Sequence, residues 1–147
     1  MRRSYLDYNA TAPLRAEARA AMIAVMDQVG NPSSVHAEGR AAKAIVEKAR
    51  GQIAMAFGAV GADIVFTSGA TEAAALACAG RGLRGADIEH DAVAAWIQPE
   101  QLVRPDGGVA LTEPEKSVLQ MANSETGIVQ SLPKGLAVTD ASQAFGK

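Results

Sequence analysis

The sequence predicts an α/β fold in which helices flank a mainly parallel sheet. Apolar residues recur at helical spacing over residues 13–57, and short β-branched apolar runs alternate with helical segments further on. Such alternation is typical of a layered fold whose helices connect parallel strands. A chain of 147 residues suits a single domain. We divide it into an N-terminal arm with helices over 1–58 and a sheet-bearing part over 59–147.

The composition excludes several classes of protein. Lys and Arg total 14 against 16 Asp and Glu, and this balance argues against binding to nucleic acid. No apolar run approaches the ~18 residues of a membrane helix, and no apolar stretch of a secretory signal follows the basic start. The sole cysteine, Cys78, excludes an internal disulfide and a cysteine-only metal cage. We therefore expect a cytoplasmic protein without a metal site.

Two amphipathic helices are predicted in the N-terminal part. Apolar residues at helical spacing predict the first over 13–29, and Pro13 suits its first turn. The Gly-Asn-Pro-Ser-Ser segment at 30–34 ends this helix and offers a cap to a second helix over 35–57.

The later elements are shorter. The β-branched run at 63–67 predicts a buried strand, and the small residues after it lead into an alanine-rich helix that ends near residue 83. The remaining elements are expected as a weak strand over 84–89, a short helix over 91–97, a proline-containing loop over 98–117, a strand over 118–122, a turn over 123–127 and a strand over 136–140.

Only residues 123–135 separate the last two predicted strands. A parallel crossover needs about a dozen residues or more and usually holds a helix. Pro133 and Gly135 leave little room for a helix, so we expect this connection to be a loop.

The turn at 68–71 is a candidate phosphate site. Small residues that lead into a helix expose backbone N–H groups at the positive end of the helix dipole. Gly69 permits close approach of the backbone, and Thr71 adds a hydroxyl. The alternative is a turn that merely caps a helix. The segment lacks the lysine of a P-loop and the spaced glycines of a dinucleotide loop, which disfavours nucleotide binding.

Four further side chains are candidates for a functional role. Asp140 ends the strand at 136–140, and ligands of open α/β sheets bind beyond the carboxyl ends of strands. Its carboxylate suits a protonated ring nitrogen, and Gln143 follows three residues later; the alternative is a helix-capping aspartate. His90 and His36 are each lone histidines, for which a surface or structural role is the ordinary interpretation.

Taken together, these segments resemble the class V aminotransferase superfamily and, within it, the cysteine desulfurases. The resemblance spans the chain and is carried by YLDYNATAP at 5–13, GNPSSVH at 30–36 with Gly39-Arg40, IVFTSGATE at 64–72, Glu89-His90 with Ala92-Val93, ANSETGIVQ at 122–130 and DASQAFGK at 140–147. It implies part of the large domain of fold type I, with pyridoxal 5′-phosphate (PLP) as cofactor and the PLP site within 59–147.

The resemblance also implies a role for individual residues. Ala70 and Thr71 would hold the cofactor phosphate, and His90 would stack on the pyridine ring as an auxiliary catalytic residue. Asp140 would pair with the ring nitrogen and keep it protonated, which sustains the electron sink of the cofactor. Gln143 would donate to the phenolic oxygen of the ring.

Several departures from the family pattern are visible. Ser124 stands where desulfurases usually carry an asparagine that contacts the phenolic oxygen, and serine reaches less far. The spacings between the motifs are short. The Ser-x-His-Lys segment that carries the cofactor-binding lysine, the catalytic-cysteine loop and the substrate-binding arginine are absent from the sequence. Lys147 matches the preceding motif and not this lysine, and Cys78 is expected to be a small buried thiol.

Three interpretations follow. In the first, the chain is the N-terminal part of a split desulfurase that mobilises sulfur from L-cysteine for iron–sulfur cluster assembly, and it binds PLP only with a partner chain that supplies the lysine. In the second, it is a non-catalytic or regulatory partner of a full-length desulfurase or an assembly scaffold. In the third, it is a decaying, inactive fragment. The family's sheet continues after Asp140, so we expect an uncovered edge and hence an obligate partner or a homo-oligomer.

Overall fold

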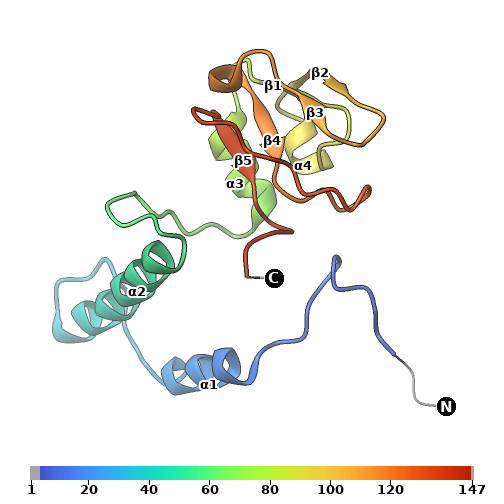
Figure 1. Ribbon diagram of the computed structural model, residues 1–147. Coiled ribbons are helices and arrows are strands. Elements are labelled where there is room, and N and C mark those ends of the chain that lie inside the picture. The colour runs from blue at the N-terminus through green and yellow to red at the C-terminus, as the bar shows by residue number, and fades with distance from the viewer. Residues whose placement is uncertain (1–3, 147) are drawn as a thin grey trace. The chain divides into compact units, whose positions relative to one another are not determined.

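The computed structural model describes residues 4–146 (Figure 1). The chain divides into two compact units, one over 1–66 and one over 67–147. The predictions for the basic start at 1–3 and for Lys147 lie outside the described residues.

The N-terminal unit contains two helices, α1 (Ala16–Val25) and α2 (Ala37–Ala56). The second agrees closely with its prediction, because His36 caps it: Nδ1 accepts a hydrogen bond from Gly39 N at 3.3 Å. The first is shorter than the predicted 13–29. Its N-cap residue, Arg15, makes no capping hydrogen bond with its side chain, and the helix ends at Val25.

The described part of the N-terminal unit has no hydrophobic core. Gly39 is its only buried residue. The loop before α2 lies so close to it that a Cβ there would come within 2.8 Å of Asn31 O. The large apolar side chains of the unit that remain exposed are Tyr5, Leu6, Tyr8, Leu14, Met22, Ile23, Val25, Met26, Val29, Val35, Met55, Phe57, Val60, Val65 and Phe66. The apolar stripe that predicts α1 is therefore present, but nothing within the described part of this unit covers it.

The strand predicted over 63–67 does not form. The segment has no sheet partner, and it is fixed by a side chain instead. Arg50 on α2 donates from Nη1 to Ile64 O, and its guanidinium lies 5.0 Å from the centre of the Phe66 ring. A β-branched pattern favours an extended backbone, but a strand also needs a neighbour to pair with.

The C-terminal unit contains the sheet. Its elements in order are α3 (Ala70–Cys78), β1 (Arg84–Ala86), α4 (Asp91–Ala94), β2 (Gln98–Val103), β3 (Val109–Ala110), a 3₁₀ turn (Pro114–Lys116), β4 (Val118–Gln120) and β5 (Val138–Asp140). Strand pairs β1–β2 and β4–β5 are parallel, and β2–β3 is antiparallel. A parallel bridge between Arg84 and Ser117 links the two groups of strands, so the predicted, mainly parallel sheet is confirmed.

The loop predicted over 98–117 is wrong, because it contains β2, β3 and the 3₁₀ turn. Pro99 enters β2 at a bulge, where the register of the β1–β2 pair shifts and a missing N–H is tolerated. The turn after β2 is closed by Arg104 N to Gly108 O at 2.8 Å, and Gly107 adopts φ +80°. The prolines and glycines that resemble a loop here form a bulge and a hairpin turn.

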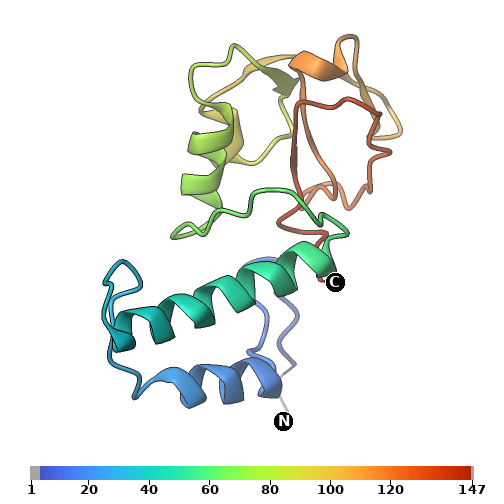
Figure 2. The same ribbon diagram turned by 90° about the vertical axis from the view of Figure 1, so that its left-hand side faces the viewer.

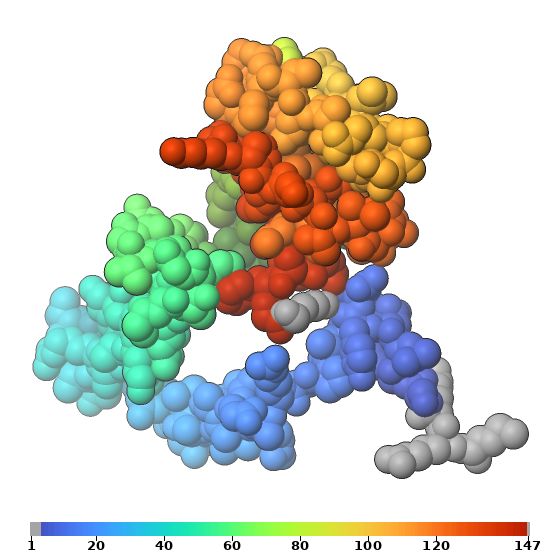
Figure 3. All heavy atoms as spheres, viewed as in Figure 1, coloured from blue at the N-terminus to red at the C-terminus, as the bar shows by residue number. Residues whose placement is uncertain are grey.

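Helix α3 ends at Cys78 and not near residue 83, because Gly80 and Gly82 adopt positive φ angles. The crossover between β4 and β5 is a loop, as predicted. Two backbone hydrogen bonds fold it back on itself, Asn123 N to Ile128 O at 3.0 Å and Gln130 N to Met121 O at 2.8 Å. In the space-filling view, the orange-to-red segment after β4 lies across the lower part of the visible face of this unit (Figure 3).

The core of the C-terminal unit lies on the sheet. One cluster joins α3, α4 and β4 through Cys78, Leu83, Val93 and Val118. A second cluster joins β1, β3 and β4 through Ala86, Val109 and Leu119. Within residues 4–146, no helix has the length and apolar character that a membrane crossing requires.

Candidate functional site

The carboxyl ends of the parallel strands gather most of the predicted site residues. Because β1, β4 and β5 run in the same direction, the residues that follow them lie at one edge of the sheet. His90 follows β1, Ser124 follows β4, and Asp140 ends β5. In both ribbon views the N-terminal end of α3 lies on the side toward which β4 and β5 point (Figure 1, Figure 2). These groups therefore lie on one side of the C-terminal unit.

The start of α3 presents backbone N–H groups. Gly69 is the N-cap, so Ala70 and Thr71 are the first helical residues and their N–H groups have no acceptor within the helix. Both residues are exposed. Glu72 turns back over the preceding loop, where its Oε2 accepts from Ser68 N at 2.7 Å and from Ser68 Oγ at 2.6 Å. These hydrogen bonds, the side-chain bond first, hold the pKa of Glu72 below its usual range.

Asp140 is half-buried at the end of β5. Its Oδ1 accepts from Ser142 N at 2.9 Å and closes a turn, and its backbone oxygen accepts from Met121 N at 2.9 Å. The residues after Asp140 form a hydrogen-bonded turn, in which Phe145 N donates to Ala141 O at 2.9 Å. Gln143 is half-buried in the turn that follows.

His90 is exposed and caps the short helix α4. Its Nδ1 accepts from Ala92 N at 3.1 Å, which leaves the proton of a neutral imidazole on Nε2. Ser124 is half-buried, and its Oγ lies 3.4 Å from Glu125 Oε1. The ring of His90 is thus held at the start of α4 through Nδ1, which is a structural role.

Two buried residues were not predicted as part of the site. Glu89 is 6% exposed, and its Oε1 accepts from Gln120 N at 3.0 Å. Its Oε2 is buried without a hydrogen-bond partner. Burial raises the pKa of Glu89, and the negative charge of Asp140 adds to the shift, although the bond from Gln120 opposes it. Asn123 is 4% exposed and organises the turn that bears Ser124.

Cys78 is buried in the core, as predicted. Desolvation raises the pKa of its thiol, so the neutral form dominates at neutral pH. A group in this state is a packing residue and not a nucleophile. Among residues 4–146, no three histidine, cysteine or acidic side chains gather closely enough to hold a metal ion.

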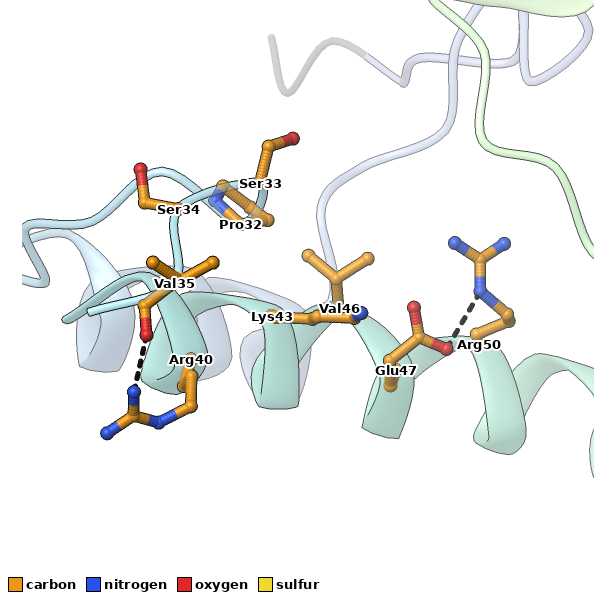
Figure 4. Close-up of a pocket in the computed structure, with 9 residues that line it drawn as sticks. All are labelled: Pro32, Ser33, Ser34, Val35, Arg40, Lys43, Val46, Glu47 and Arg50. Carbon is orange, nitrogen blue, oxygen red and sulfur yellow. Dashed lines mark hydrogen bonds and ion pairs between the residues drawn. The ribbon is translucent and has the colours of Figure 1, made fainter. Parts of the chain in front are cut away.

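A separate hollow of about 500 Å³ lies on the N-terminal unit, between the loop at 32–35 and one face of α2 (Figure 4). Arg40, Lys43, Glu47 and Arg50 line it. Arg50 bonds Glu47 at 3.2 Å, and Arg40 donates to Val35 O. None of the predicted site residues lines this hollow.

Solved NifS-like proteins share this fold over most of the chain. The mainly parallel sheet with its helices is part of a fold type I domain. The profile of the family described as aminotransferase class-V matches residues 4–147, and the chain belongs to this family. Members of the family depend in general on PLP.

The similar proteins are desulfurases and related proteins. Cysteine desulfurase IscS of Dictyoglomus turgidum is 43% identical over 102 residues, which cover 63% of this chain and 26% of that protein. Putative cysteine desulfurase NifS of Bacillus subtilis is 34% identical over 179 residues, covering 97% of this chain and 45% of the relative. A solved NifS-like protein from Rickettsia africae matches 97% of this chain and 48% of its own, with 29% identity and a TM-score of 0.79.

The chain thus spans a quarter to a half of the length of these relatives, over their N-terminal part. The alignment with the Bacillus subtilis protein extends over 179 residues, whereas this chain has 147. The relative therefore has segments without a counterpart here, in agreement with the short spacings between the motifs.

Proposed function

We propose that this chain supplies the phosphate- and ring-binding side of a PLP site of the cysteine desulfurase type. The observation that carries the proposal is the shared edge at which the start of α3, His90, Ser124 and Asp140 lie. A phosphate-binding helix terminus and a carboxylate beyond a parallel strand are the two polar groups that the two ends of PLP require.

Each residue then has one task. The N–H groups of Ala70 and Thr71 bind the phosphate, and the Thr71 hydroxyl adds a donor. Asp140 holds the proton on the ring nitrogen, His90 stacks on the ring, and Gln143 donates to the phenolic oxygen. When bound, PLP supplies an electron sink for bond cleavage at the amino acid that it carries. The partner-free carboxyl oxygen of Glu89 lies in the same part of the unit and is compatible with a ligand-binding edge.

We further propose that a second polypeptide supplies the lysine and the cysteine thiol of the desulfurase reaction. The sequence holds no Ser-x-His-Lys segment, and its one cysteine is buried in the core. The uncovered apolar side chains of the N-terminal unit support a partner, because a unit without a buried core gains little stability on its own. The sulfur of L-cysteine would pass to the partner's thiol as a persulfide, for use in iron–sulfur cluster assembly.

The test is to isolate the tagged chain from its own cells and to sequence its stoichiometric partner. The proposal expects a partner that carries a Ser-x-His-Lys segment and lacks the N-terminal motifs. It also expects the complex, but not the chain alone, to release sulfide from L-cysteine under reducing conditions. A complex that contains such a partner but neither binds PLP nor releases sulfide contradicts the proposed activity.

A second candidate function is a non-catalytic subunit that docks on a full-length desulfurase or an assembly scaffold. Ser124 favours it, because its short side chain contacts Glu125 and replaces the longer asparagine of the family. Recovery of a full-length desulfurase, whose activity this chain alters, would support this candidate over the split enzyme.

A further inference from the structure

We propose that Glu89 and Asn123 are positioning residues that tie the turn bearing His90 to the turn bearing Ser124. Glu89 directly precedes His90, and Asn123 directly precedes Ser124. The two turns follow different strands, β1 and β4, and the two residues are buried between them. The importance of these residues to catalysis rests on the proposed function, whereas the hydrogen bonds that they make do not depend on it.

Asn123 makes the first connection. Its Nδ2 donates to Ile88 O at 2.6 Å, in the turn that leads to His90, and to Gln120 Oε1 at 2.9 Å. Its Oδ1 accepts from Glu125 N and from Thr126 N, both at 2.9 Å. One amide group therefore shapes the turn around Ser124 through its oxygen and holds the turn before His90 through its nitrogen.

Glu89 makes the second connection in the opposite direction. Its Oε1 accepts from Gln120 N at 3.0 Å, at the end of β4. An apolar side chain of similar length would fill the same space without burying a carboxyl group, but it would leave the Gln120 N–H unpaired. The bonds Asn123 Nδ2 to Ile88 O and Gln120 N to Glu89 Oε1 join the same two segments in opposite directions. Together they limit sliding of the His90 turn along the sheet edge.

The oxygen of the Asn123 amide shapes the turn around Ser124, and its nitrogen holds the turn before His90. A single variant distinguishes these two functions. Asn123→Asp keeps an oxygen that accepts from Glu125 N and Thr126 N, but it loses the donor to Ile88 O and to Gln120 Oε1. The turn around Ser124 should then persist while its connection to His90 is lost. For Glu89, the amide oxygen of Glu89→Gln can still accept from Gln120 N, whereas Glu89→Ala cannot.

The experiment measures amide exchange and imidazole resonances by NMR on the full chain without cofactor. In Asn123→Asp and in Glu89→Ala we expect the His90 ring resonances to shift. In Glu89→Ala the Gln120 amide should exchange about tenfold faster, as for the loss of one buried hydrogen bond. Glu89→Gln should restore both signals toward those of the native chain, and Glu115→Ala, at an exposed glutamate, should change neither.

Two outcomes overturn the inference. Unchanged His90 resonances in both Asn123→Asp and Glu89→Ala would show that the turns are not coupled. Failure of Glu89→Gln to restore them in a folded chain would show that the side-chain oxygen is not what holds the turn. These measurements need no cofactor. If they show the two turns to be coupled while the partner complex fails to bind PLP, the inference stands and only the proposed function is contradicted.

Discussion

Glu89 is a carboxyl group with one hydrogen-bond donor for its two buried oxygens. Its neutral form suits this environment better than its charged form, which is why burial raises its pKa. The folded chain therefore holds a proton on Glu89 at pH values where the unfolded chain has released it.

The consequence is a stability that falls as pH rises. In the window that begins near the ordinary glutamate pKa and extends upward to the raised pKa of the folded state, the folded state binds more protons than the unfolded state. Glu89→Gln removes this difference. We expect the free energy of unfolding of the variant, relative to the native chain, to increase with pH across this window in urea titrations. Parallel pH profiles for the two proteins would contradict the buried, proton-binding carboxyl.

Glu72 shows the opposite shift, because its carboxylate accepts two hydrogen bonds from Ser68. Its contribution to the start of α3 is present above the ordinary glutamate pKa and is lost as pH falls through the lowered pKa of the folded state. We expect the Ser68 amide resonance to titrate below the usual glutamate range, and this transition to vanish in Glu72→Gln. A Ser68 transition at the ordinary glutamate pKa would show that the carboxylate is not bound there.

The sequence is sufficient to predict the exposed and half-buried residues at the sheet edge, but not the buried residues that support them. Asp140, His90 and Thr71 stand in recognisable motifs, and each is found at the end of a strand or the start of a helix. Glu89 and Asn123 stand in the same motifs, yet their importance comes from burial and from bonds to residues more than thirty positions away. Such contacts depend on the packing of β1 against β4, which no local pattern reveals.

At the scale of elements, glycine and proline decide where the predictions fail. The prolines and glycines around the β2–β3 hairpin predict a loop, although strands form there. Helix α3 ends earlier than predicted, before two glycines with positive φ. The segment at 63–67 has the pattern of a strand but no partner, because pairing is a property of two segments. Helix α2 and strand β5, whose patterns are local, are found close to the predicted positions.

Gly107 offers a test of the hairpin. It adopts φ +80°, and a Cβ there would lie 2.7 Å from Ile128 Cγ1 in the crossover loop. We expect Gly107→Ala to lower the free energy of unfolding by about 1–2 kcal/mol from the backbone alone, with an added steric loss. Gly127→Ala is the matched control, because φ is +71° but no atom lies within 4 Å of its Cβ. Equal losses in urea titrations of the two variants would contradict the contact between hairpin and crossover.

At the scale of the whole chain, the two units differ in how they are stabilised. The buried hydrophobic residues of the described chain all lie between Cys78 and Leu119, whereas the N-terminal unit exposes its large apolar side chains. Burial of apolar area is the main favourable term in folding, so the second unit is stable by a means that the first unit lacks.

For the isolated chain, we expect amide protection to be concentrated in the C-terminal unit. Hydrogen exchange should show slow amides in β1 and β4 and fast exchange throughout α1, whose residues are all exposed. Binding of the proposed partner should then protect α1. A soluble monomer at micromolar concentration with strong protection in α1 would show that no partner is needed.

The proposed function depends most on Asp140, which is expected to help hold PLP in a complex with a second polypeptide. The decisive measurement is the PLP content of the purified complex with the native chain, with Asp140→Ala and with Asp27→Ala, an exposed control in the N-terminal unit. We expect stoichiometric PLP in the native and control complexes and loss of the cofactor in Asp140→Ala, with the partner still bound. Equal PLP content in all three complexes would contradict the proposal and would leave this chain as a docking subunit of an enzyme complete without it.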